Sequence, residues 1–163
     1  MAEPLAARLQ ALEDREAIRN LIARYGPLAD SGDAAGIAAL FAEDGIYAVG
    51  SMGEAQGREA IAALITGPVH QSLMAAGCAH VLSAPLIELD GSRAAACCHS
   101  LVFRHEDGEW TAVRVSANRW LLERGAEGWR VKRRDNALLD GSDAARALLS
   151  LPAAPHPRPA THP

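Results

Sequence analysis

Aromatic residues are scarce in this sequence: Phe, Trp and Tyr together make up 4% of its 163 residues. Ala and Leu supply much of the apolar surface instead, and 49% hydrophobic with 22% charged residues is an ordinary composition for a globular protein. No apolar run approaches the ~18 residues that span a bilayer, and the N-terminus lacks a charged start followed by an apolar stretch. The sequence therefore predicts no membrane contact and, by default, a cytoplasmic location.

Cysteine is also scarce, with three residues at Cys78, Cys97 and Cys98. The number is odd, and the adjacent pair would point to opposite faces of a strand. We expect free, buried thiols in a reducing compartment, which behave as small apolar side chains, rather than a disulfide or a metal site.

Positive charge is neither in excess nor concentrated. Sixteen Lys and Arg stand against twenty Asp and Glu, for a net charge of -4. The densest basic run, Arg130 with Lys132, Arg133 and Arg134, would divide between both faces of a strand and form no single stripe. Nucleic acid is therefore not an expected partner.

Sequence signatures of metal and cofactor sites are missing. The six histidines do not have the spacing of metal ligands. There is no glycine-rich phosphate loop after a strand, no GxSxG elbow and no Cys-His-Asn pattern. The sequence predicts no metal and no cofactor.

The first half of the chain has the periodicity of helices. Apolar residues recur at three- and four-residue spacing from Leu5 to Ala29, and Gly26-Pro27 interrupts or bends the end of this helix. Asp30, Ser31 and Asp33 offer capping side chains for the helix that follows. The expected elements are a helix over 5–29, a short helix carrying Ile37, Leu40 and Phe41, a turn at 43–45, a strand over 46–49, a polar loop over 50–57, a helix over 58–67 and a turn or short helix over 70–74.

The second half has the character of an antiparallel meander. Extended segments at 80–89, 93–105, 110–123 and 128–138 are joined by short, Gly-containing turns, so neighbouring strands should pair antiparallel and curl. A last short helix is expected over 142–151. We place one α+β domain at residues 1–151, and we expect the Pro-rich segment 152–163 to be disordered.

Polar residues on otherwise apolar strand faces are candidates for a site. In the segment 93–105 the odd-numbered positions share one face, and we expect His99 to point inward because the others there are apolar: Ala95, Cys97, Leu101 and Phe103. On the next segment one face mixes hydrogen-bonding groups with aromatic surface, which suits a pocket wall: Ala112, Arg114, Ser116, Asn118 and Trp120.

Four further residues are predicted to converge on that pocket. Tyr25 and Asp30 lie at the end of the first helix, whereas Tyr47 lies on the short strand. His80 opens the first extended segment of the second half. A buried His beside a carboxylate has a fixed tautomer and serves as a general acid or base near neutral pH, and Tyr hydroxyls can polarise a substrate oxygen.

Each candidate also has a purely structural interpretation. His99 could be a satisfied structural residue, and Asp30 could be a helix cap. Tyr25 and Tyr47 could be ordinary core residues, and Arg114 could do no more than pair with an acidic residue of a neighbouring strand. The remaining histidines are assigned to the surface or the tail: His70, His105, His156 and His162.

The order of these features resembles a known family. After the helix that ends in Tyr25 and Asp30 come "DSGDAAGIAALFAEDGIY", "GREAI" and "AHVLSAPLIELDG". This order resembles the SnoaL-like branch of the nuclear transport factor two-like superfamily, which includes scytalone dehydratase, bile-acid dehydratase and ketosteroid isomerase. The resemblance covers Leu12 to Leu149. It implies a cone-shaped α+β barrel, with three helices closing a pocket formed by a strongly bent, mainly antiparallel sheet, and the fold hosts both enzymes and binding proteins.

The resemblance also implies site residues. The dehydratase pattern of a Tyr five residues before an Asp is matched by Tyr25 and Asp30, and its strand histidine by His80. Its second pocket histidine, its Ser-x-Asn pair and its strand tyrosine look similar to His99, Ser116 with Asn118, and Tyr47. Ala29 stands where scytalone dehydratase has a tyrosine, and the acidic oxyanion partner of ketosteroid isomerase has no counterpart. The substrate of scytalone dehydratase is therefore not implied, and a standard steroid isomerase is disfavoured.

The expected function is that of a cofactor-independent lyase, most concretely a dehydratase, acting on a small hydroxylated cyclic or aromatic compound in an enclosed apolar pocket. His80, oriented by Asp30, would be the base. Tyr25 or Tyr47 would polarise the substrate oxygen, and His99 or Asn118 would assist the leaving group. The alternatives are an isomerase, a cyclase, a retro-aldol lyase, a non-catalytic binding protein and an oxygenase accessory subunit.

Self-association is expected from the superfamily, in which an exposed sheet face commonly packs against a copy of itself. The candidate anchors for a dimer or trimer interface are Trp110, Trp120 and Trp129.

Overall fold

A curved sheet of seven strands forms the centre of the fold. Its order is β2-β1-β7-β6-β5-β3, with β4 paired to β5, and every pairing is antiparallel except that of β1 with β7. The computed structural model describes residues 4–151 apart from the side chain of Ser51. The strands are β1 (Phe41–Val49), β2 (Glu54–Gln56), β3 (Cys78–Leu82), β4 (Leu86–Asp90), β5 (Arg93–Glu106), β6 (Glu109–Gly125) and β7 (Gly128–Leu138).

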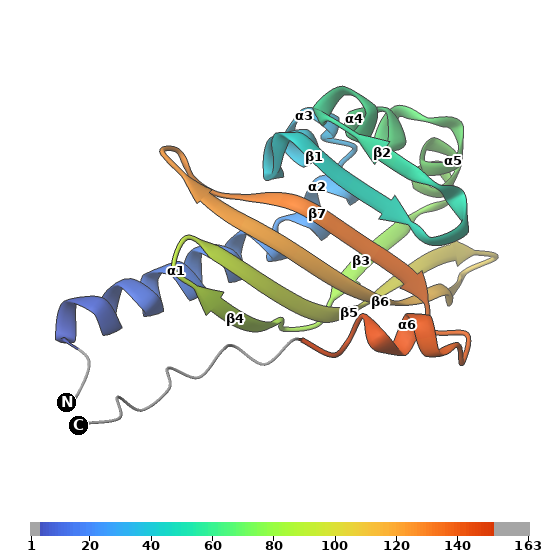
Figure 1. Ribbon diagram of the computed structural model, residues 1–163. Coiled ribbons are helices and arrows are strands. Elements are labelled where there is room, and N and C mark those ends of the chain that lie inside the picture. The colour runs from blue at the N-terminus through green and yellow to red at the C-terminus, as the bar shows by residue number, and fades with distance from the viewer. Residues whose placement is uncertain (1–3, 152–163) are drawn as a thin grey trace.

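Helices pack on this sheet, and the predicted α+β class is confirmed (Figure 1). The helical elements are α1 (Leu5–Ala23), α2 (Tyr25–Asp30), α3 (Ala34–Leu40), the 3-10 turn η1 (Gly50–Met52), α4 (Arg58–Thr66), α5 (Pro68–Ala76) and α6 (Asp143–Ala147). In Figure 1, α3, α4 and α5 gather at the top, while α1 runs along the other end of the sheet. No helix in residues 4–151 is both long and apolar enough to cross a membrane.

The first helix ends earlier than expected. The break falls at Arg24, between α1 and α2, instead of at Gly26-Pro27. Pro27 lies in the first turn of α2, where a helix makes no use of the missing N–H. Asp33 caps α3 as predicted, because its carboxylate accepts a hydrogen bond from the Gly36 backbone N–H at 2.8 Å.

Two strand predictions need correction. The expected single strand over 80–89 is two strands, β3 and β4, which pair with different parts of β5. Pro85 lies in the break between them and lacks the N–H that a continuous ladder requires. The expected loop over 50–57 contains η1 and the edge strand β2. In addition, β1 begins at Phe41 rather than Ile46, because a bulge in the strand replaces the turn expected at 43–45.

The core fills the space between the sheet and the helices. Its largest fully buried apolar side chains are Trp120, Phe41, Ile18, Ile22, Ile37, Ile61, Leu122 and Val131. Trp120 and Trp129 are buried in this cluster, so the prediction that they anchor a self-interface is wrong. Trp110 is 57% exposed, and self-association through it stays a prediction.

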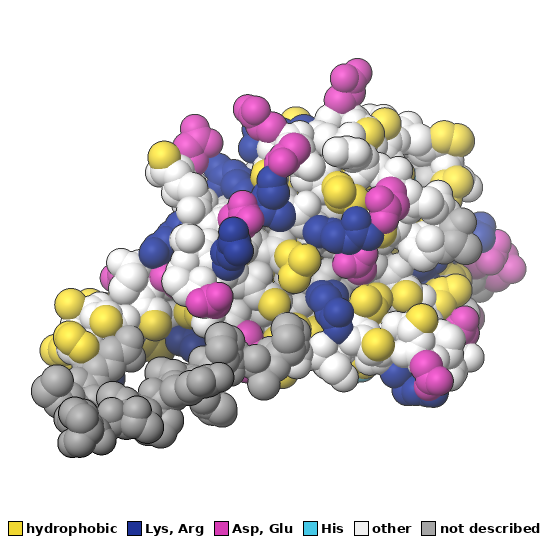
Figure 2. Space-filling view, viewed as in Figure 1, with side chains coloured by type: hydrophobic (Ala, Val, Ile, Leu, Met, Phe, Trp, Pro, Cys, Tyr) yellow, Lys and Arg dark blue, Asp and Glu magenta, His cyan; other side chains and the backbone are white. Residues whose placement is uncertain are grey.

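The basic run of β7 forms no positive stripe. Lys132 pairs with Asp44 at 2.5 Å and Arg133 with Glu54 at 2.6 Å, whereas Arg134 points into the interior. Figure 2 shows basic and acidic side chains next to one another over this face. The three cysteines are free thiols, as predicted. The expected disorder of 152–163, with His156 and His162, lies outside the described residues.

Candidate functional site

A cavity of about 710 Å³ lies between the sheet and helices α2, α4 and α5. This volume suits a small organic ligand. The polar side chains at its wall are Tyr25, Tyr47, Glu54, His70, Ser72, His80, Ser100, Arg104, Arg114, Arg134 and Asn136. Most of the remaining wall is apolar, contributed by residues such as Val49, Ile65, Leu73, Leu82 and Val102.

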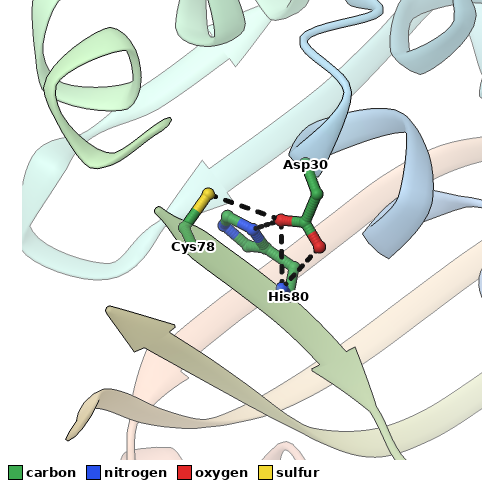
Figure 3. A group of neighbouring side chains, drawn as sticks. All are labelled: Asp30, Cys78 and His80. Carbon is green, nitrogen blue, oxygen red and sulfur yellow. Dashed lines mark hydrogen bonds and ion pairs between the residues drawn. The ribbon is translucent and has the colours of Figure 1, made fainter. Parts of the chain in front are cut away.

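Asp30 meets His80, and His80 lines this cavity (Figure 3). Asp30 is the last residue of α2, and His80 lies in the middle of β3. The Asp30 carboxylate Oδ1 lies 2.6 Å from the imidazole Nδ1 of His80, and the His80 backbone N–H donates to both carboxylate oxygens at 3.1 and 2.9 Å. Asp30 therefore orients both the ring and the backbone of His80, and the alternative that it serves as a helix cap is wrong.

The hydrogen bond to Asp30 determines the tautomer of His80. A carboxylate can only accept, so Nδ1 carries the proton and Nε2 keeps a lone pair. Burial lowers the pKa of His80 below its ordinary value of 6.5, and the adjacent Asp30 carboxylate opposes that shift. At neutral pH the ring is therefore uncharged, and Nε2 is a base at the cavity wall.

Cys78 completes the surroundings of the Asp30 carboxylate. Its thiol donates to Asp30 Oδ1 at 3.6 Å. Burial, with a smaller contribution from the Asp30 charge, raises the pKa of Cys78 to about 11, so the thiol stays protonated at neutral pH. Asp30, Cys78 and His80 lie close enough to serve as metal ligands. Their candidate ligand atoms are instead joined to one another by hydrogen bonds, with Asp30 Oδ1 as the common acceptor.

His70 is a site residue that sequence reasoning missed, and the prediction that it lies at the surface is wrong. It belongs to the first turn of α5, is buried, and lines the cavity. Its Nε2 lies 2.8 Å from the Ala29 carbonyl oxygen, and its ring centroid lies 5.5 Å from that of His80. The sequence signal for this helix was Gly67-Pro68. Proline is favoured at the first position of a helix, so a helix beginning at Pro68 would have placed His70 on α5 rather than in a turn.

His99 does not reach the cavity, and the prediction that it points inward is wrong. It is exposed on the opposite face of β5, where its ring contacts no other side chain by a hydrogen bond within residues 4–151. The inward face carries the even-numbered residues Ala94, Ala96, Cys98, Ser100 and Val102. The outward face is also apolar because the segment after α6 covers part of it, with the Cys97 thiol donating to the Leu149 carbonyl. Apolar character therefore does not identify the inner face of this strand.

Two tyrosines and an arginine form a continuous part of the cavity wall. The hydroxyl groups of Tyr25 and Tyr47 lie 3.4 Å apart, and burial raises the pKa of Tyr47, which keeps it a phenol. The guanidinium carbon of Arg134 lies 3.8 Å from the ring centroid of Tyr25 and 4.6 Å from that of Tyr47. It also lies 4.2 Å from the ring of Trp120. These contacts hold a buried positive charge against the faces of three aromatic rings.

A polar network behind that wall holds Arg114 and Arg134. Asn118 Oδ1 accepts from Arg134 Nε at 3.0 Å and Nη2 at 2.8 Å, and from Asn136 Nδ2 at 3.0 Å. Asn118 Nδ2 donates to the Ser100 hydroxyl at 2.7 Å. Arg114 donates to Ser116 Oγ at 3.1 Å and to Asn136 Oδ1 at 2.8 Å. Neither guanidinium contacts a carboxylate within residues 4–151, so the expected alternative of an Arg114 ion pair is wrong.

The expected substrate-binding residues thus divide into two layers. Tyr47 and Arg114 line the cavity. Ser116, Asn118 and Trp120 are fully buried behind the wall and support Arg114 and Arg134. The sequence did not point to three further cavity residues, Arg134, Ser100 and Asn136. Each lies on a strand among apolar or charged neighbours, and the pattern did not show which face of the strand points inward.

The fold and this site define a SnoaL-like α+β barrel. The chain matches the SnoaL-like domain over residues 10–135 and belongs to that family, which confirms the resemblance. An NTF2-like protein with a cystatin-like fold from Novosphingobium aromaticivorans is 60% identical, over 90% of this chain and 96% of that one, with a TM-score of 0.89.

More distant solved structures share the fold alone. A candidate scytalone dehydratase from Novosphingobium aromaticivorans is 20% identical, over 78% of this chain and 85% of that one, with a TM-score of 0.67. A candidate aromatic ring hydroxylase from the same species is 21% identical, over 78% and 90%, with a TM-score of 0.65. The comparison with curated proteins gave no match.

Proposed function

We propose that the protein is a cofactor-independent lyase, most concretely a dehydratase, that acts on a small hydroxylated cyclic or aromatic compound. The observation that carries the proposal is the Asp30–His80 pair at the wall of a largely apolar cavity. An uncharged imidazole with a fixed tautomer is a general base at neutral pH, and its position at the cavity gives it access to a bound ligand.

In the proposed reaction His80 Nε2 removes a proton from the carbon next to a carbonyl group. The electron pair of that C–H bond forms an enolate, whose oxygen accepts a hydrogen bond from the tyrosine pair. Because one hydroxyl accepts from the other at 3.4 Å, one O–H of Tyr25 and Tyr47 is left to donate to the ligand.

The second half of the reaction releases water. The enolate electrons return to form a carbon–carbon double bond as the bond to the neighbouring hydroxyl breaks. The proton on His80 Nε2 passes to that leaving oxygen, which restores the base. His99 takes no part, because it lies outside the cavity, and Asn118 acts only by holding Arg134.

The test is a screen of cyclic β-hydroxy ketones for the absorbance of the conjugated product. Turnover should fall by at least ~100-fold in His80→Gln and in Asp30→Asn, the scale of a lost general base, while the melting temperature stays close to that of wild type. His99→Gln is the matched control and should keep full activity. Full activity in His80→Gln would refute the proposal. Product analysis separates dehydration from isomerisation, cyclisation and retro-aldol cleavage, which would use the same groups.

A further inference from the structure

Two arginine side chains reach the cavity without an acidic partner in the part of the chain that the structure describes. Arg134 is 2% exposed and Arg114 is half-buried. Among residues 4–151, neither guanidinium forms an ion pair with a carboxylate. Charged side chains at buried positions are normally paired, so two such arginines at one cavity call for an explanation.

The hydrogen-bond partners of both arginines are neutral. Arg134 donates to the Asn118 amide oxygen, and its Nη1 is buried without a hydrogen-bond partner in the described part of the chain. Arg114 donates to the Ser116 hydroxyl and the Asn136 amide oxygen. Amide and hydroxyl oxygens fix the two guanidinium groups in position but leave their positive charges uncompensated.

The other charged groups at the wall do not supply the missing negative charge. Glu54 lines the cavity, but its carboxylate pairs with Arg133 at 2.6 Å. Arg104 adds a further positive group, paired with Glu106 at 3.2 Å. The Asp30 carboxylate is held by the ring and backbone of His80. The wall therefore presents an excess of positive charge to whatever occupies the cavity.

Arg114 has the geometry of a fixed anion-binding group. Its Nε and Nη2 are held by Ser116 and Asn136, so the planar fork is oriented before a ligand arrives. The two amide side chains of Asn136 and Asn118 connect Arg114 to Arg134 in one hydrogen-bonded row. A planar carboxylate matches a guanidinium fork better than a spherical anion does.

We propose that the substrate of this cavity is a ring compound that carries a carboxylate, and that Arg114 binds this carboxylate while the buried charge of Arg134 adds to its attraction. The proposal rests on the proposed function and narrows it, since it assigns the acid-base chemistry of His80 and Asp30 to anionic substrates. The Asp30–His80 pair would act at the reacting carbon. Arg114 would bind the carboxylate of the same ligand at another part of the cavity wall.

The test measures binding rather than turnover, with benzoate and its neutral analogue benzamide as probes. Isothermal titration at pH 8 should give at least tenfold tighter binding of benzoate to the wild-type protein. Arg114→Gln should remove this preference, and Arg93→Gln, which deletes an exposed arginine far from the cavity wall, should retain it. Thermal unfolding of each variant checks that the fold is intact.

A second readout locates the bound anion. In an NMR titration, saturating benzoate should raise the pKa of the His80 ring, because a negative charge in the cavity stabilises the imidazolium. Equal affinity for benzoate and benzamide, or a preference that survives in Arg114→Gln, would overturn the inference. Dehydration of neutral hydroxy ketones without any charge preference would sustain the proposed function and reject this inference. A preference for benzoate over benzamide, without turnover of any screened compound, would support a carboxylate-binding cavity and reject the proposed lyase activity.

Discussion

Gly26 lies against the backbone of His80: a Cβ atom at Gly26 would sit 2.2 Å from the His80 carbonyl oxygen. Only glycine allows α2 to approach β3 this closely. Four residues later the same helix ends in Asp30, whose carboxylate reaches the His80 ring. The close approach of helix and strand at Gly26 therefore positions the two members of the proposed acid-base pair.

Gly26→Ala should separate α2 from β3, because the contact is with backbone that cannot rotate away. We expect a loss of about 1–3 kcal/mol in the free energy of unfolding, the scale of overpacking, and reduced catalysis through misplacement of Asp30. Urea unfolding measures the first effect. Gly125→Ala is the matched control, since nothing lies within 4 Å of a Cβ there, and it should be close to neutral. Equal stability of the two variants would show that α2 can shift without cost.

The protonation of His80 should set the acid limb of the pH–rate profile. Burial lowers its pKa, so activity should be retained below pH 6.5 and fall only as the pH drops through the lowered value. Asp30→Asn removes the charge that favours the imidazolium and should lower the pKa of His80 further. NMR titration of the His80 ring measures its pKa in the wild-type protein and in Asp30→Asn. An unchanged pKa in Asp30→Asn would contradict the pairing.

The same shift predicts how stability depends on pH. The unfolded chain binds a proton at His80 more tightly than the native protein does, because the native pKa lies below 6.5. The contribution of His80 is therefore present above pH 6.5 and is lost as the pH falls through the native value. Thermal melts of wild type and His80→Gln across this range should therefore show different dependences of the melting temperature on pH.

His70, whose ring lies beside that of His80, should lower the pKa of His80. When His70 carries a proton, its charge disfavours a second positive charge on His80 and lowers the pKa of that ring. His70→Phe keeps an aromatic ring at 5.5 Å but removes the charge and the hydrogen bond to the Ala29 carbonyl. We expect the pKa of His80 to rise and the protein to lose about 1 kcal/mol of stability. A pKa of His80 that does not respond would remove His70 from the site.

Asn118 should stabilise the fold through the three hydrogen bonds that its Oδ1 accepts. Asn118→Leu leaves Nε and Nη2 of Arg134 and the Asn136 amide without their acceptor, which should cost at least ~2 kcal/mol. Asn20→Leu is the control, because Asn20 lies on the exposed side of α1 and, within residues 4–151, its side chain bonds only to Glu16. Chemical denaturation compares the two. Similar stabilities would mean that Arg134 finds other partners.

Local patterns predicted the elements that bear the proposed pair. Helical periodicity before Asp30 and a strand beginning near His80 were both readable, and the SnoaL-like order of features indicated that they meet. Strand faces were harder to assign. Both faces of β5 are apolar, one because it faces the cavity and core and the other because the segment after α6 covers part of it at Cys97, so alternation alone put His99 inside.

The arginines illustrate a second limit of sequence reasoning. Arg134 belongs to a run of four basic residues within five positions, and in sequence it looks like a surface charge. Its burial depends on Asn118 of β6 and on rings from α2, β1 and β6, which come together only in the folded chain. His70 was missed for a related reason, since its inward direction depends on where α5 begins.

The parallel pairing of β1 with β7 places Tyr47 beside Arg134, and so joins an early strand to the last one. During synthesis on a ribosome, the tyrosine pair and the base would emerge well before Arg134 and Asn136. Such distant pairings also slow folding, because a long loop must close before they form. The cavity can therefore acquire the buried charge of Arg134, and the Asn136 amide that holds Arg114, only after nearly the whole domain has been translated, so nascent chains that stop short of β7 should not retain an anionic ligand.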